Sequence, residues 1–127
     1  MKPEFVDHIV LMVSNVKKSK EFYSKFLGRE IQENKESVAF QVGDTKLFLG
    51  LPYKWIKNNK FDKNRIGLNH LAFGVRTLEE LKKFEKILND SKIKNSGIQI
   101  DKYGKKEFIW FNDPDGIRLE FYLRPIR

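Results

Sequence analysis

Hydrophobic and polar residues along the chain predict a strand, a helix and three short strands, and then the same series again. The first strand is expected at Phe5 to Val13, a run of β-branched and aromatic residues without a breaker. A helix follows at Val16 to Leu27, with Ser14-Asn15 as its N-cap and Gly28 as its stop. Turn-forming residues then separate three predicted strands: Arg29 to Asn34, Ser37 to Val42 and Lys46 to Leu51.

The second series begins with a predicted strand at Leu68 to Val75. Thr77 and, three residues later, Glu80 form a capping box, which predicts a helix that runs to about Ser91. The last three strands are expected at Ile98 to Asp101, Glu107 to Asn112 and Arg118 to Leu123. The order of elements in this half therefore repeats the order in the first.

The two halves align without a gap when His70 is laid over His8, and Val75 then falls on Val13. A half-domain that cannot bury its own hydrophobic face is expected to pair with its copy. The expected fold is therefore α+β, with two tandem βαβββ modules forming a curved mixed β-sheet cup with flanking helices. We expect one domain, 1–127, with module one at 4–51 and module two at 67–125.

The segment 52–66 between the modules interrupts the pattern with lysines and asparagines, among which aromatic residues are placed. A connection of this length is either a linker or a functional lid. In the first case Trp55 and Phe61 anchor a linker to the core, and in the second they cover the mouth of a substrate site.

Composition removes several classes of function. The chain has no cysteine, which excludes disulfides, thiolate metal sites and a cysteine nucleophile. The net charge of +8 comes without zinc-finger spacing or an RNA-binding aromatic motif, so we expect no nucleic acid partner. The lysines either form a solvated surface alone or also attract a small anionic substrate. The N-terminus has no signal core and no apolar run could span a bilayer, so a cytoplasmic protein without a membrane partner is expected.

The chain contains only two histidines, His8 and His70, and both occupy the same place in the repeat. Two histidines make half of a metal site, which a carboxylate would complete. Glu120 lies in the apolar strand near the C-terminus, where a carboxylate is costly unless Arg118 or a metal ion compensates its charge. The expected metal ligands are therefore His8, His70 and Glu120.

These residues resemble a known family. His8, His70, the turn Asp113-Pro114-Asp115-Gly116 and Glu120 together resemble the vicinal oxygen chelate superfamily, and the resemblance covers essentially the whole chain. This superfamily holds glyoxalase I, extradiol dioxygenases, fosfomycin-resistance enzymes and bleomycin-resistance proteins. The resemblance implies a cup around a divalent metal ion (Zn, Ni, Mn or Fe), substrate oxygens that chelate the ion, and a homodimer.

The chain also departs from individual members of that superfamily. Glyoxalase I enzymes usually have a fourth ligand, a glutamate at the end of module one, and the strand Leu47 to Leu51 offers none. Extradiol dioxygenases have a further histidine, which this chain lacks. Fosfomycin-modifying members use the same three ligands and an anion clamp, to which Tyr103, Lys105, Lys106 and Arg118 could contribute. Bleomycin-binding members generally lack the metal ligands.

We therefore predict a divalent-metal-dependent, glyoxalase-like lyase or isomerase that acts on a small, oxygenated, anionic molecule through bidentate chelation to the metal. The alternatives are a fosfomycin-type thiol or water transferase, a single-module extradiol-type dioxygenase and a non-catalytic small-molecule binding protein. Predicted catalytic residues are Glu120, Tyr122 and Arg118. Predicted substrate-binding residues are Arg118, Trp110, Lys105 and Tyr103.

Overall fold

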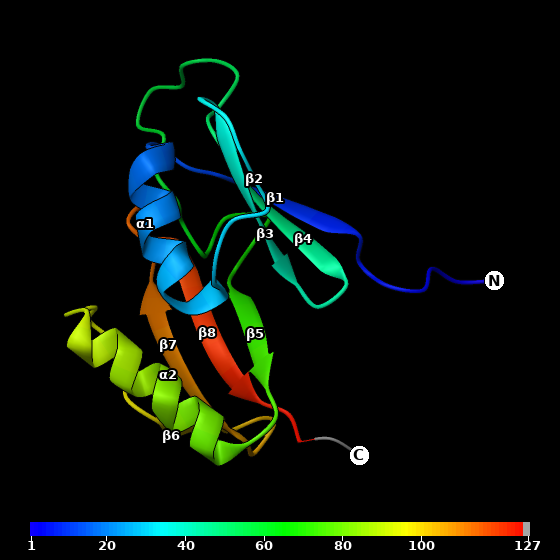
Figure 1. Ribbon diagram of the computed structural model, residues 1–127, viewed down its shortest axis with the longest axis vertical. Helices are drawn as coiled ribbons and strands as arrows, with labels where there is room; N and C mark the ends of the chain where they lie inside the picture. The colour runs from blue at the N-terminus through cyan, green and yellow to red at the C-terminus, as the bar shows by residue number, and fades with distance from the viewer. Residues whose placement is uncertain (126–127) are drawn as a thin grey trace. The chain divides into compact units, whose positions relative to one another are not determined.

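The structure is a computed structural model that describes residues 1–125 and divides into two compact units, Met1–Asn59 and Lys60–Arg127 (Figure 1). Each unit contains a strand, a helix and three further strands in that order. The predicted α+β class and the two tandem βαβββ modules are therefore confirmed.

The first unit is a four-stranded sheet with one helix against it. Its strands run in the order β1-β4-β3-β2, with β1 parallel to β4 and the other neighbours antiparallel. The helix buries Val16, Phe22, Tyr23 and Phe26. The elements are β1 (His8–Met12), α1 (Val16–Leu27), β2 (Gln32–Glu33), β3 (Ser37–Val42) and β4 (Thr45–Gly50).

The second unit repeats this topology with the order β5-β8-β7-β6, in which β5 is parallel to β8. Its elements are β5 (Leu71–Val75), α2 (Leu78–Asp90), β6 (Gln99–Ile100), β7 (Glu107–Asn112) and β8 (Arg118–Leu123). Figure 1 shows α2 lying across one face of this sheet. The opposite face is the one that carries the candidate site.

Both helices begin where the sequence predicts, because each has a side chain that accepts a hydrogen bond from an otherwise unpaired backbone N–H. The Asn15 side chain accepts from the Lys18 N–H at 3.0 Å, and the Thr77 hydroxyl accepts from the Glu80 N–H at 3.1 Å. The two caps occupy equivalent places in the repeat. The first helix ends at Gly28, whose φ of +80° suits a residue without a Cβ.

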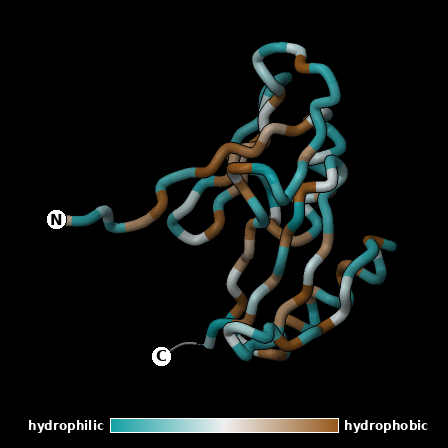
Figure 2. Tube along the Cα trace, turned by 180° about the vertical axis from the view of Figure 1, so that it is seen from behind, coloured by the Kyte–Doolittle hydropathy of each residue, from teal (hydrophilic) through white to brown (hydrophobic). Residues whose placement is uncertain are grey.

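The side chains of β8 alternate between the buried core and the face that carries the candidate site. Leu119, Phe121 and Leu123 are buried, and the ring of Phe121 stacks on Phe84 of α2 with centroids 4.4 Å apart. Because successive strand residues point to opposite faces, the residues between them are directed away from α2. Figure 2 shows hydrophobic and hydrophilic residues following one another along the chain.

Several predicted strands are shorter in the structure. The first strand begins at His8, and Phe5 and Val6, which were expected within it, are more than half exposed. Strands β2 and β6 have two residues each. After β2 the Asn34 side chain accepts hydrogen bonds from two backbone N–H groups of the following turn, so the chain leaves the ladder there.

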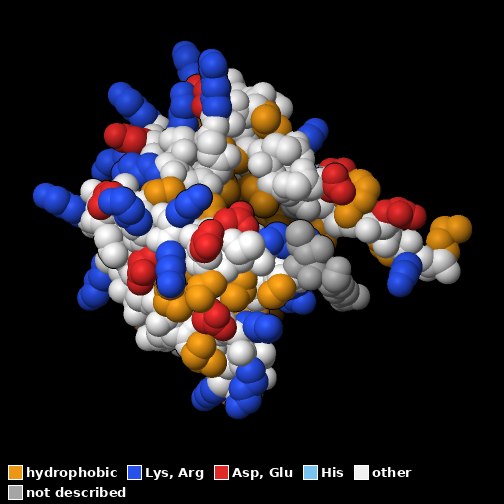
Figure 3. Space-filling model, turned by 60° about the horizontal axis from the view of Figure 1, so that its bottom comes forward, with side chains coloured by type: hydrophobic (Ala, Val, Ile, Leu, Met, Phe, Trp, Pro, Cys, Tyr) orange, Lys and Arg blue, Asp and Glu red, His pale blue; other side chains and the backbone are white. Residues whose placement is uncertain are grey.

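The segment between the modules contains neither helix nor strand over residues 51–70. Of the two alternatives for this segment, an anchor at Trp55 does not agree with the structure, since the Trp55 side chain is 84% exposed; Phe61 is half-buried. Within residues 1–125, no helix combines the length and apolar character that a membrane-spanning segment needs. In Figure 3, Lys and Arg side chains stand at many separate places on the face shown, with Asp and Glu among them.

Candidate functional site

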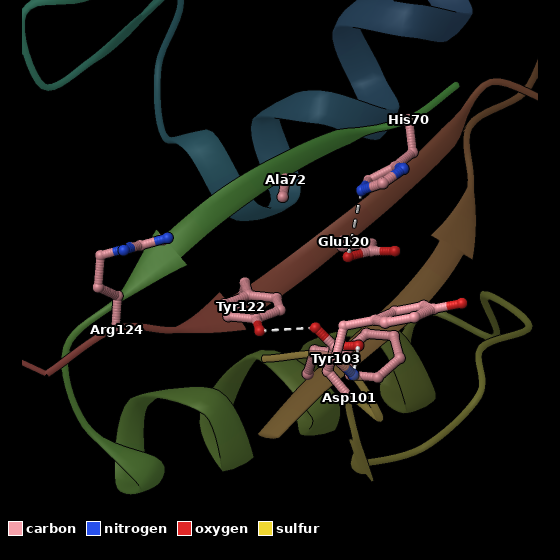
Figure 4. A pocket seen from close by; sticks show the side chains of 9 residues that line it. His70, Ala72, Asp101, Tyr103, Glu120, Tyr122 and Arg124 are labelled. Carbon is pink, nitrogen blue, oxygen red and sulfur yellow. Dashed lines mark hydrogen bonds and ion pairs between the residues drawn. The ribbon is translucent and has the colours of Figure 1, made fainter. Parts of the chain in front are cut away.

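An open cavity of about 470 Å³ lies on the face of the second unit opposite α2 (Figure 4). Its floor is formed by β5 and β8, and residues of β7 and of the loop before it complete the lining. The lining residues are His70, Ala72, Gly74, Asp101, Tyr103, Phe108, Glu120, Tyr122 and Arg124.

His70 and Glu120 meet at one end of this cavity. His70 immediately precedes β5, and Glu120 pairs with Ala72 in the β5–β8 ladder, so both side chains reach the same face. His70 Nε2 lies 3.6 Å from Glu120 Oε1, and Figure 4 shows the ring directed at the carboxylate. His70 and Glu120, which the sequence predicted to belong to one site, therefore lie next to each other in the structure.

The other nitrogen of each histidine is held by the residue before it. His70 Nδ1 lies 2.7 Å from Asn69 Oδ1, and His8 Nδ1 lies 2.8 Å from Asp7 Oδ1. Both oxygens accept hydrogen bonds, which favours the tautomer with the hydrogen on Nδ1, and in that neutral ring Nε2 has its lone pair available. Metal-binding histidines are typically oriented in this way. Asp7 and Asn69 were not predicted from the sequence.

Burial raises the pKa of the Glu120 carboxyl above its usual value, and the charges of His70 and Arg118 oppose this effect. The Glu120 side chain is 13% exposed, while His70 is 39% exposed. The structure therefore agrees with the expectation that a carboxylate in this strand is costly. A bound cation would offset that cost more fully than the neighbouring side chains do.

Arg118 and Trp110 form a pair beside the cavity and are not among the residues that line it. The guanidinium carbon of Arg118 lies 4.0 Å from the centroid of the Trp110 ring, a cation–π contact. Arg118 Nε also donates a 3.1 Å hydrogen bond to Asn112 Oδ1. Arg118 is thus positioned to influence the Glu120 carboxyl electrostatically, as its effect on that pKa indicates.

Tyr122 lines the middle of the cavity and donates a 2.8 Å hydrogen bond from its hydroxyl to Asp101 Oδ2. The Asp101 carboxylate also accepts hydrogen bonds from the backbone N–H groups of Tyr103 and Gly104, each at 3.1 Å. The Tyr122 hydrogen bond is the main reason that the pKa of Asp101 is lowered, and the same bond raises the pKa of Tyr122. The phenol therefore keeps its proton at neutral pH.

The loop 101–106 carries the other two residues predicted to bind substrate. Tyr103 lines the cavity rim and is 84% exposed. Lys105 has a φ of +59° and its backbone N–H donates to the Asp101 carbonyl at 2.7 Å. The Lys105 side chain is exposed and is not part of the lining, so the cavity does not include it.

Two charged lining residues, Asp101 and Arg124, were missed in the sequence. Arg124 extends the alternation of Arg118, Glu120 and Tyr122 by one step, so the period of two could have revealed it. Asp101 gave no comparable signal, because its partner Tyr122 lies far along the chain and the contact depends on strand pairing.

Among residues 1–125, taken one unit at a time, no group of three His, Asp or Glu side chains forms a metal cluster. His8 belongs to the first unit, whereas His70 and Glu120 belong to the second. The three-ligand set therefore stays a prediction from the sequence.

Comparisons with known proteins agree with this fold. The model of the Glyoxalase/Bleomycin resistance protein/Dioxygenase superfamily matches residues 5–121. The uncharacterized protein YaeR of Escherichia coli (strain K12) is 30% identical over 126 residues, which cover 92% of this chain and 94% of YaeR. The metallothiol transferase FosB of Lysinibacillus sphaericus (strain C3-41) is 30% identical over 123 residues, which cover 96% of this chain and 84% of FosB.

A solved structure is similar as well. The crystal structure of a glyoxalase family protein from Enterococcus faecalis superposes with a TM-score of 0.74 at 26% sequence identity. The match covers 94% of this chain and 97% of that one. The similarity therefore extends over both modules.

Proposed function

Because the chain belongs to the Glyoxalase/Bleomycin resistance protein/Dioxygenase superfamily, we propose that it is a divalent-metal-dependent, glyoxalase-like enzyme acting on a small, oxygenated, anionic molecule. The observation that carries this proposal is the approach of His70 Nε2 to Glu120 Oε1, 3.6 Å apart at the end of an open cavity. A histidine and a carboxylate directed at one point are suitable ligands for Zn, Ni, Mn or Fe(II).

The proposed ligands are His8, His70 and Glu120, and their chemistry fits the metal. Both histidines have Nδ1 engaged by a neighbouring side chain, which leaves Nε2 as the donor atom. Glu120 is a partly buried carboxylate whose raised pKa reflects a charge that its surroundings do not fully compensate. A homodimer is proposed as well, from the resemblance to members whose cups are built or completed by two chains.

When bound, the metal would supply Lewis-acid chemistry to two adjacent oxygens of the substrate, since three protein ligands leave coordination positions open. The side chains of the cavity have separate tasks. Tyr122 holds a proton on its hydroxyl and directs that proton at Asp101, which leaves the phenol oxygen able to accept a hydrogen bond from the substrate. Phe108 forms part of the wall and would present an apolar surface to the substrate.

A second candidate function is thiol transfer to a small epoxide such as fosfomycin, supported by the 30% identity to a metallothiol transferase. In that reaction a sulfur–carbon bond forms as an epoxide carbon–oxygen bond breaks, and the resulting alkoxide takes up the proton that the thiol has lost. Electrophilic assistance to the leaving oxygen is the requirement that a metal site meets.

The test is a reaction screen with protein reconstituted separately with Zn, Ni, Mn or Fe(II). Methylglyoxal with a thiol, fosfomycin with L-cysteine, and catechol with oxygen represent the three reaction types, and products are identified by mass spectrometry. We expect metal-dependent turnover in the first or second reaction and its loss in Glu120→Gln. Turnover of catechol alone would replace the proposal by a dioxygenase, and the absence of any metal-dependent product would reject the proposal for these substrates.

A further inference from the structure

We propose that Arg124 is an anion-binding residue, which makes the substrate an elongated molecule with a carboxylate or phosphate-like group at the end away from the metal. Figure 4 shows Arg124 at one end of the cavity and His70 at the other, with Tyr122 between them. The proposal of a substrate that reaches both ends rests on the proposed function for the end near His70 and Glu120.

The strand geometry sets the length of such a molecule. Glu120, Tyr122 and Arg124 alternate along β8 and its continuation, and four residues of extended chain span ~13 Å. Ala72 and Gly74 form the floor between the two ends, and a Cβ added at Gly74 would have nothing within 4 Å. Small residues thus leave the space along the strand open for a ligand that reaches both ends.

The backbone of Arg124 is held on both sides, which fixes the point at which its side chain leaves the strand end. Its N–H donates to the Val75 carbonyl at 2.8 Å, and its carbonyl accepts a 3.2 Å hydrogen bond from Arg76 Nη1. The Arg124 side chain is part of the lining of the cavity. A second guanidinium, that of Arg76, adds positive charge near the same end.

Arg118 provides the contrast that assigns this role to Arg124. The guanidinium of Arg118 is stacked on Trp110 and bonded to Asn112, and it lies outside the lining. A guanidinium binds a carboxylate or phosphate through two parallel hydrogen bonds, a geometry that lysine does not reproduce. Arg124 is the residue that brings this recognition into the cavity.

The test measures anion binding without metal, so that it is independent of the proposed chemistry. Chelator-treated, ¹⁵N-labelled protein is titrated with inorganic phosphate at constant ionic strength, and amide shifts are followed by NMR. We expect saturable shifts at Gly74, Tyr122 and Arg124, and an affinity at least about tenfold lower in Arg124→Gln. Arg124→Lys should fall between the two, and Arg29→Gln, an equal charge change at an exposed residue, should bind like the wild type.

Equal weakening by Arg124→Gln and Arg29→Gln would overturn the proposal, because it would show attraction by net charge alone. Unchanged binding in Arg124→Gln, or no saturable binding by the wild type, would overturn it too. The NMR spectrum reports whether each variant is folded. Glu120→Gln separates the two proposals: it should lose metal affinity and bind phosphate at least as tightly as the wild type, because it removes a negative charge from the same cavity. If its metal affinity is unchanged, the proposed function fails while the Arg124 site stands on its own result.

Discussion

Phe48 and Glu120 occupy equivalent positions in the two modules. Phe48 pairs with Val10 in the parallel ladder of β1 and β4, and Glu120 pairs with Ala72 in the parallel ladder of β5 and β8. His8 lies two residues before Val10, and His70 lies two residues before Ala72, so the two histidines have different neighbours on the adjacent strand. The ring of His8 meets Phe48 edge-on with centroids 5.8 Å apart, whereas His70 approaches a carboxylate. The duplicated fold thus carries an acidic group at this position in the second module alone.

Asp7→Ala and Asn69→Ala should each weaken metal binding about 10- to 100-fold, because each removes the oxygen that orients a histidine ring. Affinity is measured by competition with a chelator of known strength at neutral pH. The ¹⁵N chemical shifts of the ring nitrogens report whether the hydrogen still resides on Nδ1. Asp44→Ala, a matched change at an exposed turn residue, should leave both measurements unchanged. Wild-type affinity in both variants would show that the two oxygens have no positioning role.

Tyr122→Phe should raise the pKa of Asp101 toward its ordinary value of 3.8, since the Tyr122 hydrogen bond is the main cause of its lowering. A carboxyl whose pKa is lowered by folding adds stability above its unfolded pKa and loses this contribution as pH falls through the folded value. The stability difference between wild type and variant should therefore shrink as pH falls through that lowered value. Carboxyl ¹³C NMR titration measures the pKa directly, and an unchanged Asp101 titration would contradict the prediction.

Gly104→Ala should be destabilising by about 1–3 kcal/mol, because a Cβ at this position would collide with the Tyr122 hydroxyl. The collision should also separate Tyr122 from Asp101. The backbone amides of the loop 101–106 should then exchange their hydrogens with solvent faster than in the wild type. Gly74→Ala is the control, since a Cβ added there would meet open space. Urea unfolding gives the comparison, and equal stability of the two variants would mean that the loop moves away without cost.

Phe121→Ala should cost about 3–5 kcal/mol of unfolding free energy, the range for removing a buried aromatic ring. Phe121 is 1% exposed, and its ring contacts the rings of Phe73, Phe84 and Phe111. Phe5→Ala, at a residue 55% exposed, should change stability by no more than about 0.5 kcal/mol. A small effect of Phe121→Ala would show that the core of the second unit repacks around the loss.

Local patterns account for most of what the sequence predicted correctly. Helix α1 spans the predicted residues, and β3, β7 and β8 match their predicted ranges, because their apolar periods and turn residues are contained within each segment. The ends of β1, β2 and β6 were less predictable. The length of a strand depends on where its partner stops pairing, and that information lies elsewhere in the chain.

The candidate site divides in the same way. His70, Glu120 and Tyr122 could be found from the repeat and from the period of two in β8. Arg118 was expected to face the substrate, but its position depends on β7, which supplies both Trp110 and Asn112 as neighbours. The position of Asp101 in the site likewise depends on a residue far along the chain, since a hydrogen bond from Tyr122 holds its carboxylate. Cross-strand contacts of this kind leave no local signature.

Metal content tests the central proposal most directly. Protein purified without chelator is examined by elemental analysis together with the variants His8→Ala, His70→Ala and Glu120→Gln, after NMR has shown that each is folded. One divalent ion per chain is expected in the wild type at neutral pH, with an affinity reduced at least about tenfold in each variant. A wild-type protein that binds no divalent metal, or variants that bind it as tightly as the wild type does, would contradict the three-ligand site.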